Sequence, residues 1–205
     1  MAESITVHGT GRVEARPDVA VLDLGTEGRA ESVDGALGIA SRALNAMTGA
    51  LREQGFVDED LRTEGPTTYT VTDDVGRVNS YVCSFRLTAR VADPARAGAL
   101  LAVCVAHAGD AGRVHGVSYQ LSDRAGHQRQ ARALAVADAR SRATQLAELV
   151  DRRLGRATSV VEAGAGGPIR PMAKAMSLSM DSAAELEPGV EQVSVGVEVT
   201  WVFAD

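Results

Sequence analysis

The sequence is poor in several residue types, and each shortage excludes a class of protein. Only 3% of its 205 residues are aromatic, so side chains on which nucleic-acid bases could stack are scarce. Two cysteines, Cys83 and Cys104, cannot build a disulfide framework, and the apolar residues around each predict a buried thiol. No apolar run approaches the roughly 18 residues of a membrane-spanning helix, so we expect no membrane span.

The start of the chain does not resemble a secretion signal. Residues 1–5 have neither the basic start nor the apolar core of such a signal. We therefore expect a cytoplasmic protein, with a secreted protein already trimmed of its leader as the alternative.

The charge balance is acidic. The net charge is −6 and the pI is about 5.3, although the basic residues are almost all arginine and Lys174 is the single lysine. An acidic surface repels phosphate backbones, so we expect no nucleic-acid partner. Hydrophobic residues make up 45% of the chain and charged residues 23%, which is typical of a folded globular protein.

Hydrophobic periodicity predicts an α+β fold with the order β-β-α-β-β-α-β-α-β-β, in which helices pack on mixed or antiparallel sheets. Alternation of apolar and polar residues predicts strands at 5–13, 19–24, 61–71, 79–91, 114–121, 158–162 and 193–203. Apolar residues at helical spacing predict helices at 32–54, 94–108 and 124–154.

Local signals add four expectations. Gly9 and Gly11 predict a kink or bulge in the first strand, and the Pro17-Asp18 turn predicts a hairpin over the first 30 residues. The glycines inside the first helix predict that this helix packs closely on a sheet. The C-terminal strand is expected to return into the same fold as the N-terminal strand.

For the domain organisation, we predict one domain over 1–205, with two intertwined lobes as the alternative. We also predict a flexible or partner-binding segment at 164–188.

Several short motifs, in this order and spacing, resemble the SIMPL family, also called DUF541. They are VHGTG at 7–11, PDVA at 17–20, LRT at 61–63, VAD at 91–93, VSYQLSD at 117–123, ARALAVADAR at 131–140 and PGVEQVSV at 188–195. The resemblance covers almost the whole chain and implies an α+β fold with helices on mixed sheets. It also implies ring- or channel-like homo-oligomers as in some relatives, envelope or oxidative-stress roles as in some bacterial ones, and no established enzymatic activity.

No motif predicts a catalytic residue, a cofactor or a metal site. Gly9 and Gly11 lack the third glycine and the following helix of a dinucleotide-binding turn. The histidines are not at metal-ligand spacing from one another or from cysteine; they are His8, His107, His115 and His127.

Three arginines of the third predicted helix form a candidate anion-binding or partner-binding face. Arg132, Arg140 and Arg142 are expected on one side of the helix, where a phosphate or an acidic partner could dock. The alternative is a solvated face in which Asp138 and Glu148 pair with these arginines.

Methionines at four-residue spacing form a candidate self-association stripe. It consists of Met172, Met176, Leu178 and Met180. Thioethers adapt to irregular apolar surfaces, which suits a sister subunit. The alternatives are a stripe that folds onto its own core, a disordered loop, or binding of a soft metal.

Three functions remain open at this stage. The first is a non-enzymatic, oligomeric assembly or scaffold protein of the SIMPL type, linked to stress responses. The second is a binding or carrier module for a small apolar ligand held between helices and sheet. The third is an enzyme of unrecognised type, which would need convergent polar groups with perturbed pKa values.

Overall fold

The computed structural model describes residues 3–163 and 187–204, and these residues form two compact units. The first unit contains residues 3–16, 121–163 and 189–204, and the second contains 17–120 and 187–188. The order of helices and strands is the predicted one, so the α+β class is confirmed. No helix in the described residues is both long enough and apolar enough to cross a membrane.

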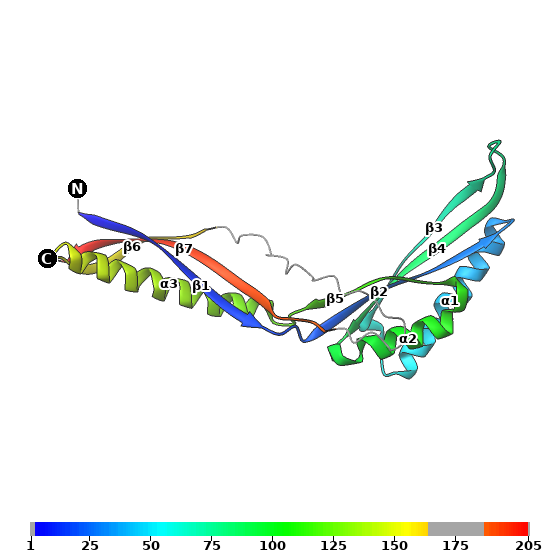
Figure 1. The fold of residues 1–205 in the computed structure, drawn as a ribbon, viewed down its shortest axis with the longest axis horizontal. Helices are drawn as coiled ribbons and strands as arrows, with labels where there is room; N and C mark the ends of the chain where they lie inside the picture. The colour runs from blue at the N-terminus through cyan, green and yellow to red at the C-terminus, as the bar shows by residue number, and fades with distance from the viewer. Residues whose placement is uncertain (1–2, 164–186, 205) are drawn as a thin grey trace. The chain divides into compact units, whose positions relative to one another are not determined.

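Each unit consists of an antiparallel sheet with helices on one face (Figure 1). The first unit contains β1 (Ser4–Ala15), α3 (Arg124–Leu149), β6 (Arg153–Ala163) and β7 (Glu191–Ala204). The second contains β2 (Val19–Ala30), α1 (Val33–Glu53), β3 (Leu61–Thr72), β4 (Val78–Val91), α2 (Ala97–Ala108) and β5 (Gly112–Gln120).

In the first unit, β7 lies between β1 and β6, and α3 runs along the sheet (Figure 1). The predicted return of the C-terminal strand is confirmed, because β7 pairs with β1 from Ser4 opposite Val202 to Ala15 opposite Glu191. The predicted hairpin over the first 30 residues is wrong, since β2 belongs to the sheet of the second unit. The buried face of β7 packs against α3 through Val195, Val197, Val199 and Trp201.

The glycines of β1 serve a close helix approach, and the predicted bulge is wrong. The pairing of β1 with β7 runs without a register shift. A Cβ added at Gly9 would lie 2.2 Å from the backbone oxygen of Ala135, and one at Gly11 would lie 1.9 Å from that of Ala131. Alanines at four-residue spacing give α3 a flat, fully buried stripe. The backbone of α3 therefore rests almost directly on β1.

In the second unit the strand order is β3-β4-β2-β5, and α1 and α2 pack on one face. The closest contact again involves a strand glycine, since a Cβ at Gly28 would lie 2.2 Å from the oxygen of Ala36 in α1. The buried hydroxyl of Thr26 donates to the Ala40 oxygen over 2.9 Å. The prediction that this helix packs closely on a sheet is therefore confirmed. Among the glycines of α1, Gly35 lies close to β2, since a Cβ there would lie 2.9 Å from the Ala30 Cβ, whereas a Cβ at Gly49 would meet nothing within 4 Å.

The helix ends follow local capping chemistry, with one correction. Ser32 caps α1 by accepting a hydrogen bond from the Gly35 amide over 3.1 Å. The last helix ends at Leu149 rather than at 154, because the chain turns at Asp151, whose φ is 57°. The next strand, β6, begins at Arg153.

The close approach of α3 to β1 makes a stability prediction. Replacing Gly9 with Ala forces the helix and strand apart, so we expect the free energy of unfolding to fall by about 1–3 kcal/mol. Thr10→Ala, on the exposed face of the same strand, is the control and should change stability by no more than about 0.5 kcal/mol. Chemical denaturation followed by circular dichroism measures both. Equal effects of the two substitutions would contradict the close-contact interpretation.

Candidate functional site

The second unit carries a hollow on the face of its sheet that the helices leave uncovered. We call it the charged hollow; its volume is about 360 Å³, and its polar lining includes Glu27, Glu64, Ser84, Arg86, Arg113 and His115. These residues come from β2, β3, β4 and β5, so the hollow spans the whole width of the sheet.

Two strand irregularities create this hollow. The register of β3 against β4 shifts between Glu64 and Thr67, and the register of β5 against β2 shifts where His115 lies. The second shift brings the imidazole over Gly25, where an added Cβ would lie 2.7 Å from its Nε2 atom. Bulges commonly redirect side chains in this way.

An aspartate–arginine pair lies beside the hollow. Arg86 donates through Nε to Asp23 Oδ1 over 2.7 Å and through Nη2 to Oδ2, which is a two-point contact. The hydrogen bond from Arg86 lowers the pKa of Asp23, and the nearby His115 acts in the same direction. The carboxylate therefore remains ionised well into the acidic range.

A second arginine, Arg113, is also fixed by several hydrogen bonds. Arg113 donates to Glu27 over 3.0 Å and to the backbone oxygens of Asp110 and Gly112 over 2.8 Å each. The charges of the two arginines are thus matched by carboxylates of neighbouring strands. This arrangement ties β2 to β4 and to β5 across the polar face of the sheet.

The two cysteines are buried, as predicted. Burial raises the pKa of Cys83, and it raises the pKa of Cys104 to about 11. A thiol with a raised pKa is a poor nucleophile at neutral pH, because the thiolate is the reactive form. Both side chains therefore act as small apolar residues in the core.

Two of the histidines contact residues of their own unit. His8 pairs with Glu198 over 3.1 Å on the exposed face of the first sheet, and the Nδ1 atom of His107 lies 2.8 Å from the Val103 oxygen within α2. Within residues 3–163 and 187–204, no group of three or more His, Cys, Asp or Glu side chains is arranged to hold a metal ion.

The three predicted arginines of α3 do not share one face. Arg132 reaches β6, where its Nε donates to Glu162 over 2.8 Å, and Arg140 lines a hollow on that same side. Arg142 lies on the opposite side of the alanine stripe and contacts β1, donating to the His8 oxygen over 3.4 Å.

The pairing expected for these arginines is found in part. Arg142 pairs with Asp138 at 3.0 Å, as the alternative of a solvated face proposed. Arg132 pairs with Glu162 instead, and this contact raises the pKa of the arginine and lowers that of the glutamate. The methionine stripe, Met172, Met176, Leu178 and Met180, lies outside the described residues.

Sequence reasoning missed the charged hollow. The sequence does hold a signal, because Gly65-Pro66 interrupts β3 and Gly116 interrupts β5. Glycine or proline inside a strand pattern often marks a bulge. That these two interruptions meet on one face of a sheet depends on the pairing of strands, which the pattern along each strand does not contain.

Fold and site together define a class: an α+β protein of two units, each with helix packed on sheet, in which the charged groups of the hollow join neighbouring strands to one another. The family follows from comparison. The model of the SIMPL family, described as a protein of unknown function (DUF541), matches residues 5–201. The chain therefore belongs to the SIMPL family, as the sequence motifs predicted.

Two curated relatives carry the same name. The chain is 27% identical over 214 residues to the "26 kDa periplasmic immunogenic protein" of Brucella melitensis and to that of Brucella abortus. Each alignment covers 96% of this chain and 83% of the relative. The name describes these relatives as periplasmic, which conflicts with the cytoplasmic location predicted from the sequence.

Solved structures give only distant likenesses. An amidase of the hydantoinase/carbamoylase family from Burkholderia ambifaria is 12% identical with a TM-score of 0.29, covering 52% of this chain and 28% of the amidase. AtUAH, solved in complex with (S)-hydroxyglycine, is 16% identical with a TM-score of 0.32, covering 64% of this chain and 32% of AtUAH. Likenesses this partial carry no argument about activity.

The Asp23–Arg86 pair predicts a pH dependence. The folded-state pKa of Asp23 lies below its ordinary value of 3.8, so the pair stabilises the fold above that pH and stops doing so as the pH falls through the folded-state value. Asp23→Asn should cost about 0.2–1 kcal/mol at neutral pH and progressively less below pH 3.8.

Urea denaturation of both proteins between neutral and acidic pH measures this difference. Arg86→Gln and the double variant complete the cycle, because other titrating carboxylates affect all four proteins alike. A stability difference that does not change with pH would contradict the assignment.

Proposed function

We propose that this protein is a non-enzymatic assembly protein of the SIMPL type, which self-associates through the free edge of β3 and works in the periplasm. One observation carries the proposal: residues 67–72 of β3 form a strand edge that is largely exposed and carries no charged side chain. The periplasmic location rests on the name of the Brucella relatives.

The edge formed by β3 is well suited to pairing with another strand. Within the described residues, β3 is the outermost strand of its sheet and is bonded to β4 alone. Its residues are exposed except at Leu61 and Val71, which are half-buried, and Tyr69 is 51% exposed. Residues 67–72 are threonine, tyrosine and valine, which favour strands, and none of them is charged. An uncharged edge of this kind is a template for strand addition.

The free edge of β1 is different, and the contrast supports the choice of β3. Asp138 of α3 accepts a hydrogen bond from the Thr10 amide over 2.8 Å, and Arg142 donates to the His8 oxygen. Side chains of the helix thus satisfy backbone groups that an added strand would need. A second copy that pairs with β1 would have to displace them.

The groups best placed for chemistry already have structural partners, which favours an assembly role over an enzyme. Asp23 and Arg86 bind each other, Arg113 binds Glu27 and two backbone oxygens, and Cys104 is buried. The space between helices and sheet in the second unit is filled by packed side chains such as Leu22 and Leu87. A carrier of a small apolar ligand remains the alternative hypothesis.

Self-association predicts a particle larger than one chain. Size-exclusion chromatography with light scattering should give a mass of at least twice 21.4 kDa for the full chain. Thr68→Lys combined with Thr70→Lys places two charges on the β3 edge and should reduce the mass to that of a monomer, because paired edges would bring the added lysines of two copies together.

The matched control is Ser118→Lys on β5, the other edge strand of the same sheet, where Ser118 is exposed. It should leave the mass unchanged. Dissociation by Ser118→Lys and not by the β3 variant would move the contact to β5 and contradict the proposal. A monomeric wild-type chain at high micromolar concentration would contradict self-association altogether.

The proposed location has its own test. When the natural gene is expressed in its source bacterium, osmotic shock should release the protein together with a periplasmic marker enzyme. Cofractionation with a cytoplasmic marker would contradict the periplasmic proposal and restore the location predicted from the sequence.

A further inference from the structure

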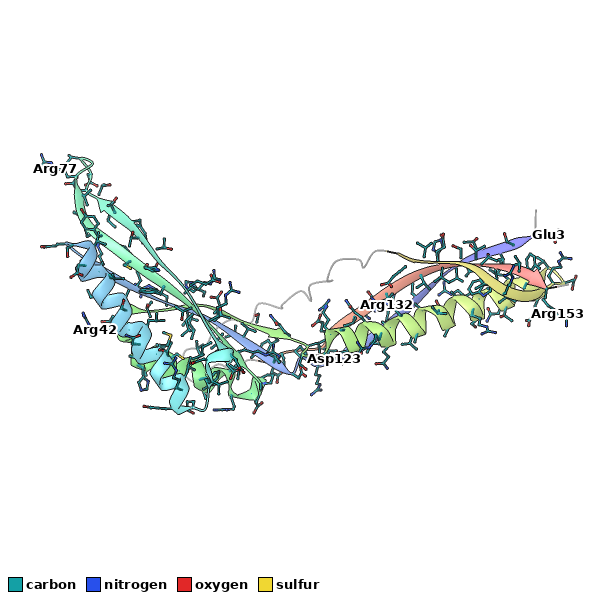
Figure 2. The ribbon with its side chains drawn as sticks, turned by 180° about the vertical axis from the view of Figure 1, so that it is seen from behind. Glu3, Arg42, Arg77, Asp123, Arg132 and Arg153 are labelled. Carbon is teal, nitrogen blue, oxygen red and sulfur yellow. The ribbon has the colours of Figure 1, made fainter. Side chains whose placement is uncertain are left out.

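The charged hollow of the second unit is centred on a glycine. Arg86 of β4 and Arg113 of β5 both lie opposite Gly25 of β2 in the sheet. Because Gly25 has no side chain, the space between the two arginines stays open, and the register shift in β5 brings His115 to its rim. In Figure 2 the labelled Arg42 marks α1, and the hollow lies on the face of this sheet turned away from that helix.

Three polar side chains that line this hollow have hydrogen-bonding groups to offer a ligand. Within residues 3–163 and 187–204, the side chains of His115, Ser84 and Thr67 make no hydrogen bond and no ion pair. Thr67 and Ser84 lie directly opposite each other on β3 and β4, so their hydroxyls are neighbours on one face. Arg86 uses its Nε and Nη2 groups for Asp23, which leaves its Nη1 group as a further donor.

The charges around the hollow balance one another. The two arginines of its lining are matched by Asp23 and Glu27. Glu64, the other acidic residue of the lining, pairs with Arg62 over 2.9 Å. An ion that entered the hollow would lose hydration without gaining a counter-charge of its own, and a zwitterion would meet charges that are already paired. The hollow therefore favours a polar ligand that carries no charge.

The size and the hydrogen-bonding groups together select a ligand class. A volume of about 360 Å³ lies at the lower end of the roughly 300–1,000 Å³ of small-molecule sites. The hydroxyls of Ser84 and Thr67 each donate and accept, and a neutral imidazole donates through one nitrogen and accepts through the other. The hydroxyls of a sugar also donate and accept, so one ring can satisfy several of these groups at once. We propose that the charged hollow binds a neutral monosaccharide, with Ser84 and His115 as its principal hydrogen-bonding partners.

Sugar binding in the hollow goes beyond the proposed self-association and does not depend on it. Saturation-transfer NMR of the full chain with glucose, galactose, mannose and N-acetylglucosamine, each titrated separately, should show saturable binding of at least one sugar. Ser84→Ala removes one hydroxyl and should weaken that binding roughly two- to tenfold, the range for one neutral hydrogen bond. His115→Ala should weaken it by a similar factor, because it also removes one hydrogen-bonding group.

The matched control is Ser118→Ala. It makes the same substitution in the same sheet, but Ser118 is exposed on β5 and does not line the hollow, so the sugar affinity should stay the same. Ser84 and His115 make no side-chain hydrogen bond within the described residues, so both of their variants should fold like the parent chain. Circular dichroism of each variant verifies this.

Two charged probes test the choice of a neutral ligand. Glycine and inorganic phosphate, titrated in the same way, should neither bind saturably nor displace the sugar; displacement by either would contradict the proposal. No saturable binding of any of the four sugars, or equal weakening by Ser84→Ala and Ser118→Ala, would overturn it. Because the particle mass is measured independently, either proposal can fail while the other stands.

Discussion

The close approach of a helix backbone to a strand backbone is the constraint on which both units depend. In the first unit it joins Gly9 and Gly11 to the alanine stripe of α3, and in the second it joins Gly28 to Ala36. Small residues bury little apolar area each, so the contact is stabilising only if the two backbones fit without a gap. The larger apolar side chains, such as Trp201, then fill the space on either side of this line.

This constraint also determines where charges can lie. A stripe of alanine has no polar atoms, so the charged residues of α3 lie in rows on its two sides, next to the strands at the sheet edges. Asp138 and Arg142 bind the β1 backbone on one side, and Arg132 binds Glu162 of β6 on the other. These contacts are exposed and individually weak, yet they act together with the packed stripe to fix how the helix lies on the sheet.

The sequence predicts elements well because their signals are local. The alternation of apolar and polar residues over 193–203 predicts a strand, and these residues lie in β7. Ser32 is a residue type that favours the N-cap position, and it caps α1. Strand partners are not local. The turn at 17–18 therefore predicts a hairpin of the first two strands, although the true partner of β1 begins at Glu191. The glycines of β1 also indicate a close neighbour, which the bulge interpretation does not include. Gly9 and Gly11 lie two and four residues after Val7, so all three are on the buried face of β1. A strand face without side chains allows another backbone to approach closely. The sequence does not predict the charged hollow for the same reason. Which side chains meet in the hollow depends on the pairing and register of four strands, and these are not encoded by local patterns.

In the part of the chain that the structure describes, each sheet has one face without a helix, and the chemistry of these faces favours contacts at the sheet edges. On the open faces, polar groups are already paired across strands, as in His8 with Glu198 and Asp23 with Arg86. A partner that covered them would have to desolvate ion pairs, which costs more than their attraction in water returns. A partner that adds a strand at β3 instead gains main-chain hydrogen bonds from groups that face solvent, and it leaves the paired charges hydrated. Assembly by strand addition is therefore the association that this distribution of charge opposes least.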